Sequence, residues 1–354
     1  MEILQISAYA GITGGNHIPS LLHLEKRMKE QGYTTVYALL ETVSNFSWCK
    51  ELQTHAKVYF LPVKRARILL RTYLTLQRIF QQHEITLVHS HFELYDIPAV
   101  VVAGHKAKVF WHLHDPIGEY LENGKWSRKM LMHLQYSCMG KNAKLLTVSQ
   151  KHGEVACKLG FFRDNVVYIP NGLDLSRILD SSMMEKKAEF LMFSWDFYRK
   201  GADLAIQASD ALYAEKKGFT LKLVPGNEQI VRSYLISCKP VENVNDLYKT
   251  AGCFLHLSRA EGLSYALLEA IYAGLPVICS DIPENLPVID CPTVTMVEAE
   301  NVEAIQKAMG DVVDSGFRPS QRDVEVSRKI IRERFSIETW GENIMKCYFN
   351  TLML

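Results

Sequence analysis

The stretch that decides the fold is Arg259-Ala260-Glu261-Gly262-Leu263-Ser264-Tyr265-Ala266-Leu267-Leu268-Glu269-Ala270. It follows the apolar run 253–257, which predicts a buried strand, and it leads into a helix that Gly274 and Pro276 end. A loop with a glycine therefore joins a strand to a helix. Open α/β sheets bind ligands at such junctions, because a helix begins with unpaired N–H groups and the positive end of its dipole.

Two carboxylates bracket this loop. Glu261 precedes the predicted helix and Glu269 lies within it. Carboxylate oxygens accept hydrogen bonds, so a sugar or a ribose, both rich in hydroxyl groups, is a suitable partner for each of them. The stretch therefore predicts a ligand site with two acceptors and a set of backbone donors.

Apolar runs recur along the whole chain with amphipathic stretches between them, such as 19–31 and 203–217, that are long enough for crossover helices. Most runs are apolar throughout, which is typical of parallel strands covered on both faces. The pattern predicts an α/β fold with two doubly wound sheets, one in each half of the chain. The predicted strands are 3–8, 35–40, 57–61, 86–90, 108–113, 145–149, 166–169, 189–194, 221–224, 253–258, 276–280 and 293–297.

The length of 354 residues exceeds one ordinary core and predicts two domains. A polar stretch from Asn171 to Glu185 is the expected joint. We therefore expect domains at 1–170 and 171–320, followed by a helical segment at 321–354 without a further strand.

Composition excludes several classes of protein. The net charge of +1 offers no basis for binding nucleic acid, and no apolar run reaches the length of a membrane span. The N-terminus begins directly as a strand and does not resemble a signal peptide. The eight cysteines are scattered without a Cys-x-x-Cys pair, which indicates reduced core thiols in a cytoplasmic protein.

The common nucleotide signatures are absent from the sequence: it contains neither Gly-x-Gly-x-x-Gly nor a Walker loop. Gly11-Ile12-Thr13-Gly14-Gly15-Asn16 does follow the first predicted strand. It either holds an anion on backbone N–H groups or is a glycine-rich turn selected for tight packing. There is no Asp-x-Asp, which weakens any case for a divalent cation at a nucleotide diphosphate.

Trp111-His112-Leu113-His114-Asp115 ends a predicted strand, and alternation places His112 and His114 on one face. A His-x-His pair can bind a metal ion, but no carboxylate or thiol set accompanies this one. We expect His112 to be a core residue and His114, at the carboxyl end of the strand, to contact substrate.

Two basic segments have alternative interpretations. Arg199 and Lys200 lie just before a predicted helix, where they either clamp a diphosphate or form a solvated basic turn. Segment 64–80 contains five basic residues and no acid. It either lies on an anionic membrane or packs its apolar face against the sheet.

Together these segments resemble the retaining glycosyltransferases of the GT-B fold, specifically family 4. The Glu-x7-Glu signature of that family matches Glu261 to Glu269. Further matches, in the same order along the chain, are 114–115, 146–149, 167–174, 199–203 and 271–280. The resemblance implies two Rossmann-like domains that face a central cleft, with the C-terminal helix packed back toward the first domain.

The resemblance also implies site roles. Glu269 would hold the ribose, Glu261 the transferred sugar, and Lys200 the leaving diphosphate, while His114 would touch the sugar from the first domain. The remaining implied donor contacts are Gly15, Arg199, Gly262, Leu263, Ser264 and Tyr265. The mechanism requires no metal ion and no cofactor. One departure concerns the phosphates: where the family often has a Gly-Arg pair, this chain has Ser194-Trp195, and Arg199 is the candidate replacement.

The implied function is transfer of a sugar from a nucleotide-sugar, expected to be a UDP-sugar, to a sugar or lipid-linked acceptor in bacterial surface polysaccharide or glycolipid synthesis. The expected location is the cytoplasm, with peripheral contact to the inner face of the plasma membrane through 64–80. Two alternatives are a non-catalytic GT-B partner that stabilises a true transferase, which the missing arginine motivates, and a nucleotide-sugar epimerase.

Overall fold

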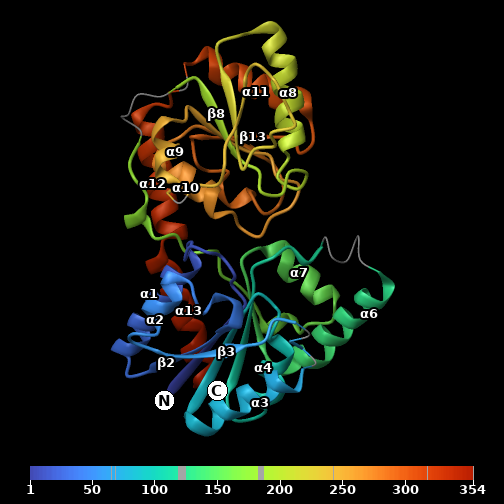
Figure 1. Cartoon of the computed structure of the whole chain (residues 1–354), viewed down its shortest axis with the longest axis vertical. Coiled ribbons are helices and arrows are strands. Elements are labelled where there is room, and N and C mark those ends of the chain that lie inside the picture. Colours follow the sequence, from blue (N-terminus) through green and yellow to red (C-terminus); the bar gives the residue numbers. More distant parts are fainter. Residues whose placement is uncertain are drawn as a thin grey trace. The chain divides into compact units, whose positions relative to one another are not determined.

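The chain forms two compact α/β units in a computed structural model (Figure 1). The structure describes residues 1–64, 66–67, 69–118, 125–181, 187–241, 243–316 and 318–353, and of Arg128 the backbone alone. Unit 1 comprises Met1–Gly172 and Ile337–Leu354, and unit 2 comprises Leu173–Ser336. Parts of the predicted membrane segment 64–80 and of the predicted joint 171–185 lie outside the described residues.

Unit 1 is built on a seven-stranded sheet in the order β3-β2-β1-β4-β5-β6-β7, and all its strand pairs are parallel. The order reverses between β1 and β4, which is where doubly wound sheets open a crevice for ligands. The strands are β1 (Glu2–Ser7), β2 (Thr34–Leu40), β3 (Lys57–Leu61), β4 (Ile85–His91), β5 (Lys108–Leu113), β6 (Lys144–Thr147) and β7 (Val166–Tyr168). Each coincides with a predicted strand.

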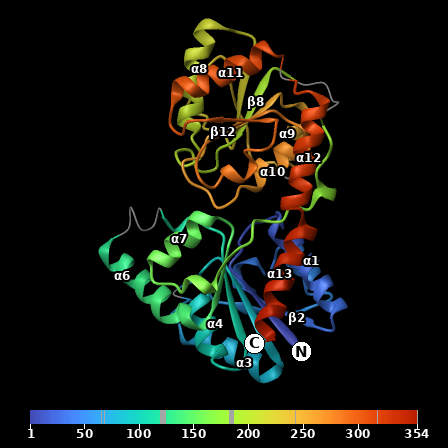
Figure 2. The same ribbon diagram turned by 180° about the vertical axis from the view of Figure 1, so that it is seen from behind.

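Helices cover both faces of this sheet (Figures 1 and 2). Residues of α3 and α4 pack in one core cluster with strand residues such as Leu4 and Val88. The helices of unit 1 are α1 (His17–Glu30), α2 (Ser47–Leu52), α3 (Leu70–Gln82), α4 (Asp96–Ala103), α6 (Trp126–Leu134), which continues into a π turn (Gln135–Met139), α7 (Gln150–Lys158) and α13 (Ile337–Leu352).

The last helix of the chain completes the core of unit 1. Trp340, Ile344 and Tyr348 of α13 are buried in one cluster with strand residues such as Ile3 and Phe110. α13 lies beside α1, as both views of the ribbon show (Figures 1 and 2). The prediction that the C-terminal helix packs back on the first domain is therefore confirmed.

Unit 2 repeats the same design with six parallel strands in the order β10-β9-β8-β11-β12-β13. Sequence patterns missed one of them, β10, because it is a partly exposed edge strand of three residues without an apolar run. The strands are β8 (Glu189–Phe193), β9 (Thr220–Val224), β10 (Leu235–Ser237), β11 (Cys253–His256), β12 (Val277–Ser280) and β13 (Val294–Val297).

Two helices of unit 2, α11 and α12, begin at residues whose side chains cap them. The Asn301 side chain accepts the Ala304 N–H at 2.9 Å at the start of α11, and Ser320 accepts the Asp323 N–H at 3.1 Å at the start of α12. The helices are α8 (Ala202–Glu215), α9 (Asn245–Thr250), α10 (Tyr265–Ala273), α11 (Val302–Asp314) and α12 (Gln321–Phe335).

The unit boundaries differ from the predicted segments at the C-terminus. The predicted helical segment 321–354 divides at Ser336, so that α12 belongs to unit 2 and α13 to unit 1. The reason is packing: α12 contacts α10, whereas α13 contacts α1. None of the described helices combines the length and apolar character that crossing a bilayer demands. All eight cysteines are free, and most of them are buried.

The contribution of α13 to unit 1 is testable by truncating one buried side chain. Ile344→Ala removes a fully buried side chain and should lower the free energy of unfolding of unit 1 by about 2–5 kcal/mol. Lys346→Ala, on the exposed side of the same helix, should change it by less than about 0.5 kcal/mol. Denaturant unfolding measures both, and equal effects would contradict the packing described for α13.

Candidate functional site

The predicted site residues of unit 2 lie on the loops that follow β8 and β11, except Tyr265 and Glu269, which lie in α10. These two strands are neighbours at the sheet centre, and the strand order reverses between them. Lys200 follows β8 and Glu261 follows β11, so both lie at the switch point where a doubly wound sheet binds its ligand. The fold therefore brings together two residues that are 61 positions apart in the sequence.

Lys200 and Glu261 form a buried ion pair. The Lys200 Nζ donates to Glu261 Oε1 at 2.5 Å, and each side chain is only 8% exposed. The Ser258 hydroxyl donates to the same carboxylate oxygen at 2.7 Å. Buried charges are tolerated when they are paired and hydrogen-bonded, and this carboxylate satisfies both conditions.

The surroundings keep Glu261 ionised. Burial raises the pKa of Glu261, but the positive charge of Lys200, together with His256 and the hydrogen bonds from Lys200 and Ser258, outweighs it and lowers the pKa below its ordinary value. Burial lowers the pKa of His256 to about 4, although Glu261 opposes that shift. His256 is therefore neutral at pH 7, and Lys200 supplies the positive charge.

Arg199 points toward the same carboxylate. Its Nη1 lies 3.6 Å from Glu261 Oε2 and donates to the Ala260 carbonyl at 3.0 Å, while its Nε donates to Asp196 at 3.0 Å. The Trp195 ring lies against both cations, 4.4 Å from the Arg199 guanidinium carbon and 5.2 Å from Lys200 Nζ. Trp195 thus provides a π face for the two cations at the position where the family often has an arginine.

Arg259 is a positioning residue that sequence reasoning missed. Its guanidinium donates to both oxygens of Asp203 at 2.9 and 2.8 Å and to Glu300 at 2.6 Å. It also stacks 3.8 Å from the Tyr198 ring centroid. These contacts fix the loop after β11 against the start of α8. The polar character of segment 196–203 was the available signal, but it does not specify the partner.

Gly201 has a backbone reason to be glycine. Its φ of +77° lies in the left-handed region, and a Cβ atom there would meet the Leu257 carbonyl oxygen at 2.1 Å. The loops after β8 and β11 can approach this closely because the side chain is absent.

The donor loop predicted from the sequence leads directly into α10. Gly262, Leu263 and Ser264 are buried, and Tyr265 is the first residue of α10. The Ser264 side chain makes no capping hydrogen bond. The first N–H groups of a helix have no partner within the helix, which makes this end of α10 suitable for an anion.

Glu269 lies one turn further along α10, buried, and is bound by a residue that sequence reasoning missed. The Tyr248 hydroxyl donates to Glu269 Oε2 at 3.0 Å. Burial and the Glu269 carboxylate raise the pKa of Tyr248 well above its ordinary value, so the hydroxyl keeps its proton. Tyr248 orients the carboxylate that we expect to hold a ribose.

The two predicted residues of unit 1 lie at the carboxyl edge of its own sheet. Gly15 has a φ of +52°, and a Cβ atom there would meet the Tyr9 hydroxyl at 2.5 Å, so local geometry alone accounts for this glycine. His114 follows β5 and is surrounded by further histidines. Burial lowers the pKa of His114 to about 3, although a hydrogen bond with Asn171 opposes this. The roles of these residues toward substrate stay predictions.

Segment 64–80 is partly helical. α3 buries Thr72, Leu76 and Ile79, whereas Leu70 and Leu74 are 68% and 53% exposed. Arg67 precedes the helix and donates to the Glu93 carbonyl at 3.1 Å. The apolar face against the sheet is therefore real, but it does not account for the two exposed leucines.

Comparison with solved structures shows the fold. A glycosyltransferase from Rickettsia africae is 16% identical, covers 99% of this chain and 98% of its own, and has a TM-score of 0.78. HepE of Anabaena, solved in complex with UDP, is 16% identical with a TM-score of 0.78, and the match covers 99% of this chain and 100% of HepE. The likeness to these glycosyltransferase structures establishes two α/β units of the GT-B type.

Sequence comparison identifies the family. The lipopolysaccharide glucosyltransferase WaaG of Escherichia coli K12 is 27% identical over 186 residues, which cover 49% of this chain and 45% of WaaG. This chain therefore matches less than half of that relative. The family model for Glycosyltransferase Family 4 matches residues 20–177, and the model for Glycosyl transferases group 1 matches residues 190–315. The two models span most of the chain, which is thus a member of the family 4 glycosyltransferases with the GT-B fold.

Proposed function

We propose that this glycosyltransferase moves a sugar from a UDP-sugar to an acceptor hydroxyl with retention of the anomeric configuration. The observation that carries the proposal is the buried Lys200–Glu261 pair at the switch point of unit 2. Such a pair offers a cation to a diphosphate and a carboxylate to sugar hydroxyls in one place. The UDP complex of HepE and the glucosyltransferase activity in the name of WaaG support a UDP-sugar, with glucose as the first candidate.

The transfer step follows from these charges. The acceptor oxygen attacks the anomeric carbon on the face from which UDP departs, and the bond from that carbon to the diphosphate oxygen breaks. The acceptor proton passes to the leaving diphosphate, so atoms and charge balance. Lys200 stabilises the charge that grows on the diphosphate, and Arg199 adds a second cation 3.6 Å from Glu261. No step calls for a metal ion or a cofactor.

Donor recognition is assigned to α10 and the loop before it. Glu269, oriented by Tyr248, accepts from the ribose hydroxyls. Backbone N–H groups of Gly262, Leu263 and Ser264 face the sugar and phosphate. Glu261 accepts from the transferred sugar, while Ser258 and Lys200 fix its carboxylate. His114 and Gly15, in unit 1, remain the candidate contacts from that unit.

The acceptor is proposed to be a saccharide or lipid-linked saccharide used for bacterial surface polysaccharide or glycolipid, at the cytoplasmic face of the plasma membrane. The name of WaaG supports this class of product. Membrane contact is proposed through α3, since Leu70 and Leu74 are exposed beside Arg71, which is itself exposed and lies 3.5 Å from Glu41. Basic and apolar side chains together favour an anionic bilayer surface.

The donor is tested by measuring thermal stability with UDP-sugars and GDP-sugars, and then by analysing products with and without lipid-linked acceptors. A UDP-sugar should raise the melting temperature and be transferred or slowly hydrolysed. Interconversion of free donors without an acceptor would indicate an epimerase instead.

Glu269→Gln should weaken UDP binding about 10–100-fold, because hydrogen bonds to a charged group contribute about 1.5–3 kcal/mol. Glu303→Gln, an exposed carboxylate on α11, is the matched control.

The ion pair is tested by a double-mutant cycle on stability and activity. Lys200→Met leaves Glu261 charged and buried, which should cost about 3–5 kcal/mol of unfolding free energy. Adding Glu261→Gln removes the uncompensated charge, so the double variant should regain much of that stability. The two single variants, Lys200→Met and Glu261→Gln, and the double variant should all lose transfer activity. Variants that fold and still support the biological role would favour the non-catalytic partner instead.

The membrane contact is tested by sedimentation with vesicles of phosphatidylglycerol and phosphatidylcholine. Leu70→Glu and Leu74→Glu should reduce the vesicle-bound fraction several-fold. Each variant replaces an exposed apolar side chain by a negative charge, which the anionic lipid repels. Gln77→Glu introduces the same charge at an exposed position of α3 and should have a smaller effect. Equal vesicle binding by wild type and all three variants would contradict a role of Leu70 and Leu74 in membrane contact.

A further inference from the structure

Five histidines gather at the carboxyl edge of the unit 1 sheet: His17, His89, His91, His112 and His114. The parallel register explains the gathering, because Gln5 pairs with His89, Ser7 with His91, and His91 with His112. Side chains two positions apart point to the same face of a sheet, so these rings lie in one layer. His17 joins them from the first turn of α1.

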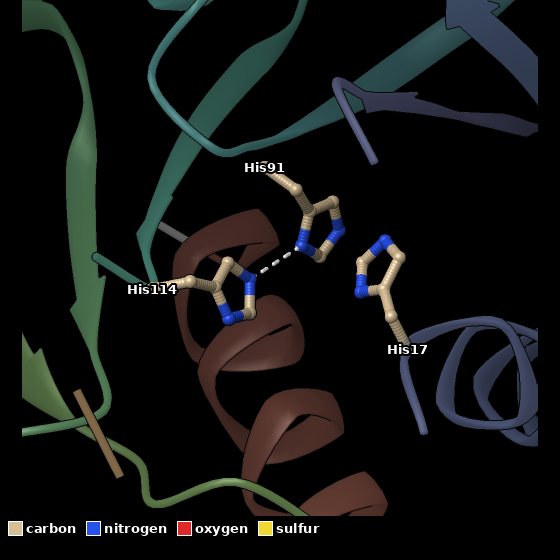
Figure 3. A group of neighbouring side chains, drawn as sticks. All are labelled: His17, His91 and His114. Atoms are coloured by element: carbon tan, nitrogen blue, oxygen red, sulfur yellow. Dashed lines mark hydrogen bonds between the residues drawn. The ribbon is translucent and has the colours of Figure 1, made fainter. Parts of the chain in front are cut away.

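Three of these rings converge from three separate elements. His91 Nδ1 lies 3.1 Å from His114 Nε2, and one ring nitrogen from each of His17, His91 and His114 lies within 4.8 Å of the other two. Figure 3 shows the His17 ring facing the His91–His114 pair. Nitrogens bound to one metal at about 2.1 Å lie about 3.4 Å apart in a tetrahedral site. The His91–His114 pair is close to this spacing, and a His17 nitrogen lies within 4.8 Å of both.

The other nitrogen of two of these rings has a polar partner. Ser7 Oγ lies 2.8 Å from His17 Nε2, and Gln5 Oε1 lies 3.1 Å from His91 Nε2. Partners of this kind orient histidines that bind metals. A common ion would use Nδ1 of His17 together with Nδ1 of His91 and Nε2 of His114, replacing the hydrogen bond between the last two.

Burial favours the neutral form of these rings. Burial, followed by the neighbouring histidines, lowers the pKa values of His17 and His91 well below the ordinary range, and burial lowers that of His114 to about 3.

We infer that His17, His91 and His114 form a binding site for a divalent transition ion with a preference for imidazole, such as Zn²⁺. Three imidazoles leave further coordination positions for water or substrate oxygen. His114 is partly exposed, so an ion can reach it, whereas His89 and His112 are buried almost completely.

A second triad, His89, His91 and His112, also lies within metal-binding distance. All three side chains are buried almost completely, so an ion has no open approach to them. The Tyr348 hydroxyl lies 2.5 Å from His89 Nδ1, and His89 Nε2 lies 3.1 Å from His112 Nδ1. These contacts make His89 and His112 a support for the first triad and not a part of it.

The site has a consequence for the reaction that rests on the proposed function. His114 is the expected sugar contact of unit 1, and a ring that binds an ion through Nε2 cannot direct that nitrogen to a sugar. The ion therefore acts as an inhibitor of transfer and not as its cofactor. Sugar transfer by this protein should therefore slow when the concentration of free Zn²⁺ rises.

The test is calorimetric titration of chelator-treated full-length protein with Zn²⁺, with Co²⁺ absorption as a second readout of the ligand set. Wild type should bind one equivalent with the visible bands of low-coordinate cobalt. Loss of a residue that only orients a metal ligand costs about 10–100-fold in metal affinity. His17→Gln and His91→Gln each remove a ligand and should weaken Zn²⁺ binding by more than this. His112→Gln, at a supporting residue outside the triad, should weaken binding less than either triad variant does, and the exposed His105→Gln should bind as wild type does.

Binding that His17→Gln leaves unchanged, or that His112→Gln abolishes, would overturn the assigned triad. Should a triad variant fail to fold, X-ray absorption of the zinc-loaded wild type decides, since it counts the imidazole ligands directly: three support the site, and one or none refutes it. A transferase assay with added Zn²⁺ and then chelator measures the inhibition separately. Loss of the transferase activity itself would leave the binding result intact.

Discussion

A charged carboxylate buried at the centre of unit 2 governs the arrangement around it. Glu261 stays ionised there because Lys200 and Ser258 reach it from fixed directions, with His256 and Arg199 close by. The two loops must therefore approach within hydrogen-bond distance, which Gly201 permits and Arg259 enforces. A shift of either loop would leave a charge without its partner, so the site tolerates little movement without a replacement ligand.

Both units place a group of polar side chains at the edge of a parallel sheet with the same strand order. In each sheet the order reverses beside the first strand, and the polar side chains gather on the loops or strand ends at that position. Unit 2 places an ion pair there and unit 1 a layer of neutral histidines. The difference in charge suits different ligands, since the ion pair accommodates phosphate and hydroxyls, whereas imidazoles accommodate an ion or an uncharged sugar.

Much of the fold could be predicted from the sequence, because parallel strands covered on both faces produce long apolar runs. The seven strands of unit 1 were all found, whereas β10, three residues at a partly exposed edge, produced no such run. Glu261, Glu269 and Lys200 were predicted because they lie in short motifs, and the structure brings Lys200 and Glu261 together. Tyr248 and Arg259 were not, since their partners are 21 and 56 positions away and no periodicity links them.

The histidine layer of unit 1 was even harder to predict from sequence patterns. Sequence reasoning saw the pair His112 and His114, but the ring nearest to His114 Nε2 comes from β4 and the third from α1. Only the strand register brings these segments into one layer. The exposed leucines of α3 were likewise unpredictable in detail, because the position at which the helix begins decides which side chains face the sheet.

The membership of α13 in unit 1 affects the order of folding during synthesis. The strands of unit 1 leave the ribosome first, yet Trp340, Ile344 and Tyr348, which close one side of its core, are made only after the whole of unit 2. Until then the face carrying Ile3 and Phe110 lacks its cover. Unit 2, which is continuous in sequence, can complete its fold before unit 1 does. The nascent chain therefore carries an open apolar face on its earliest-made half, a natural place for a chaperone to bind.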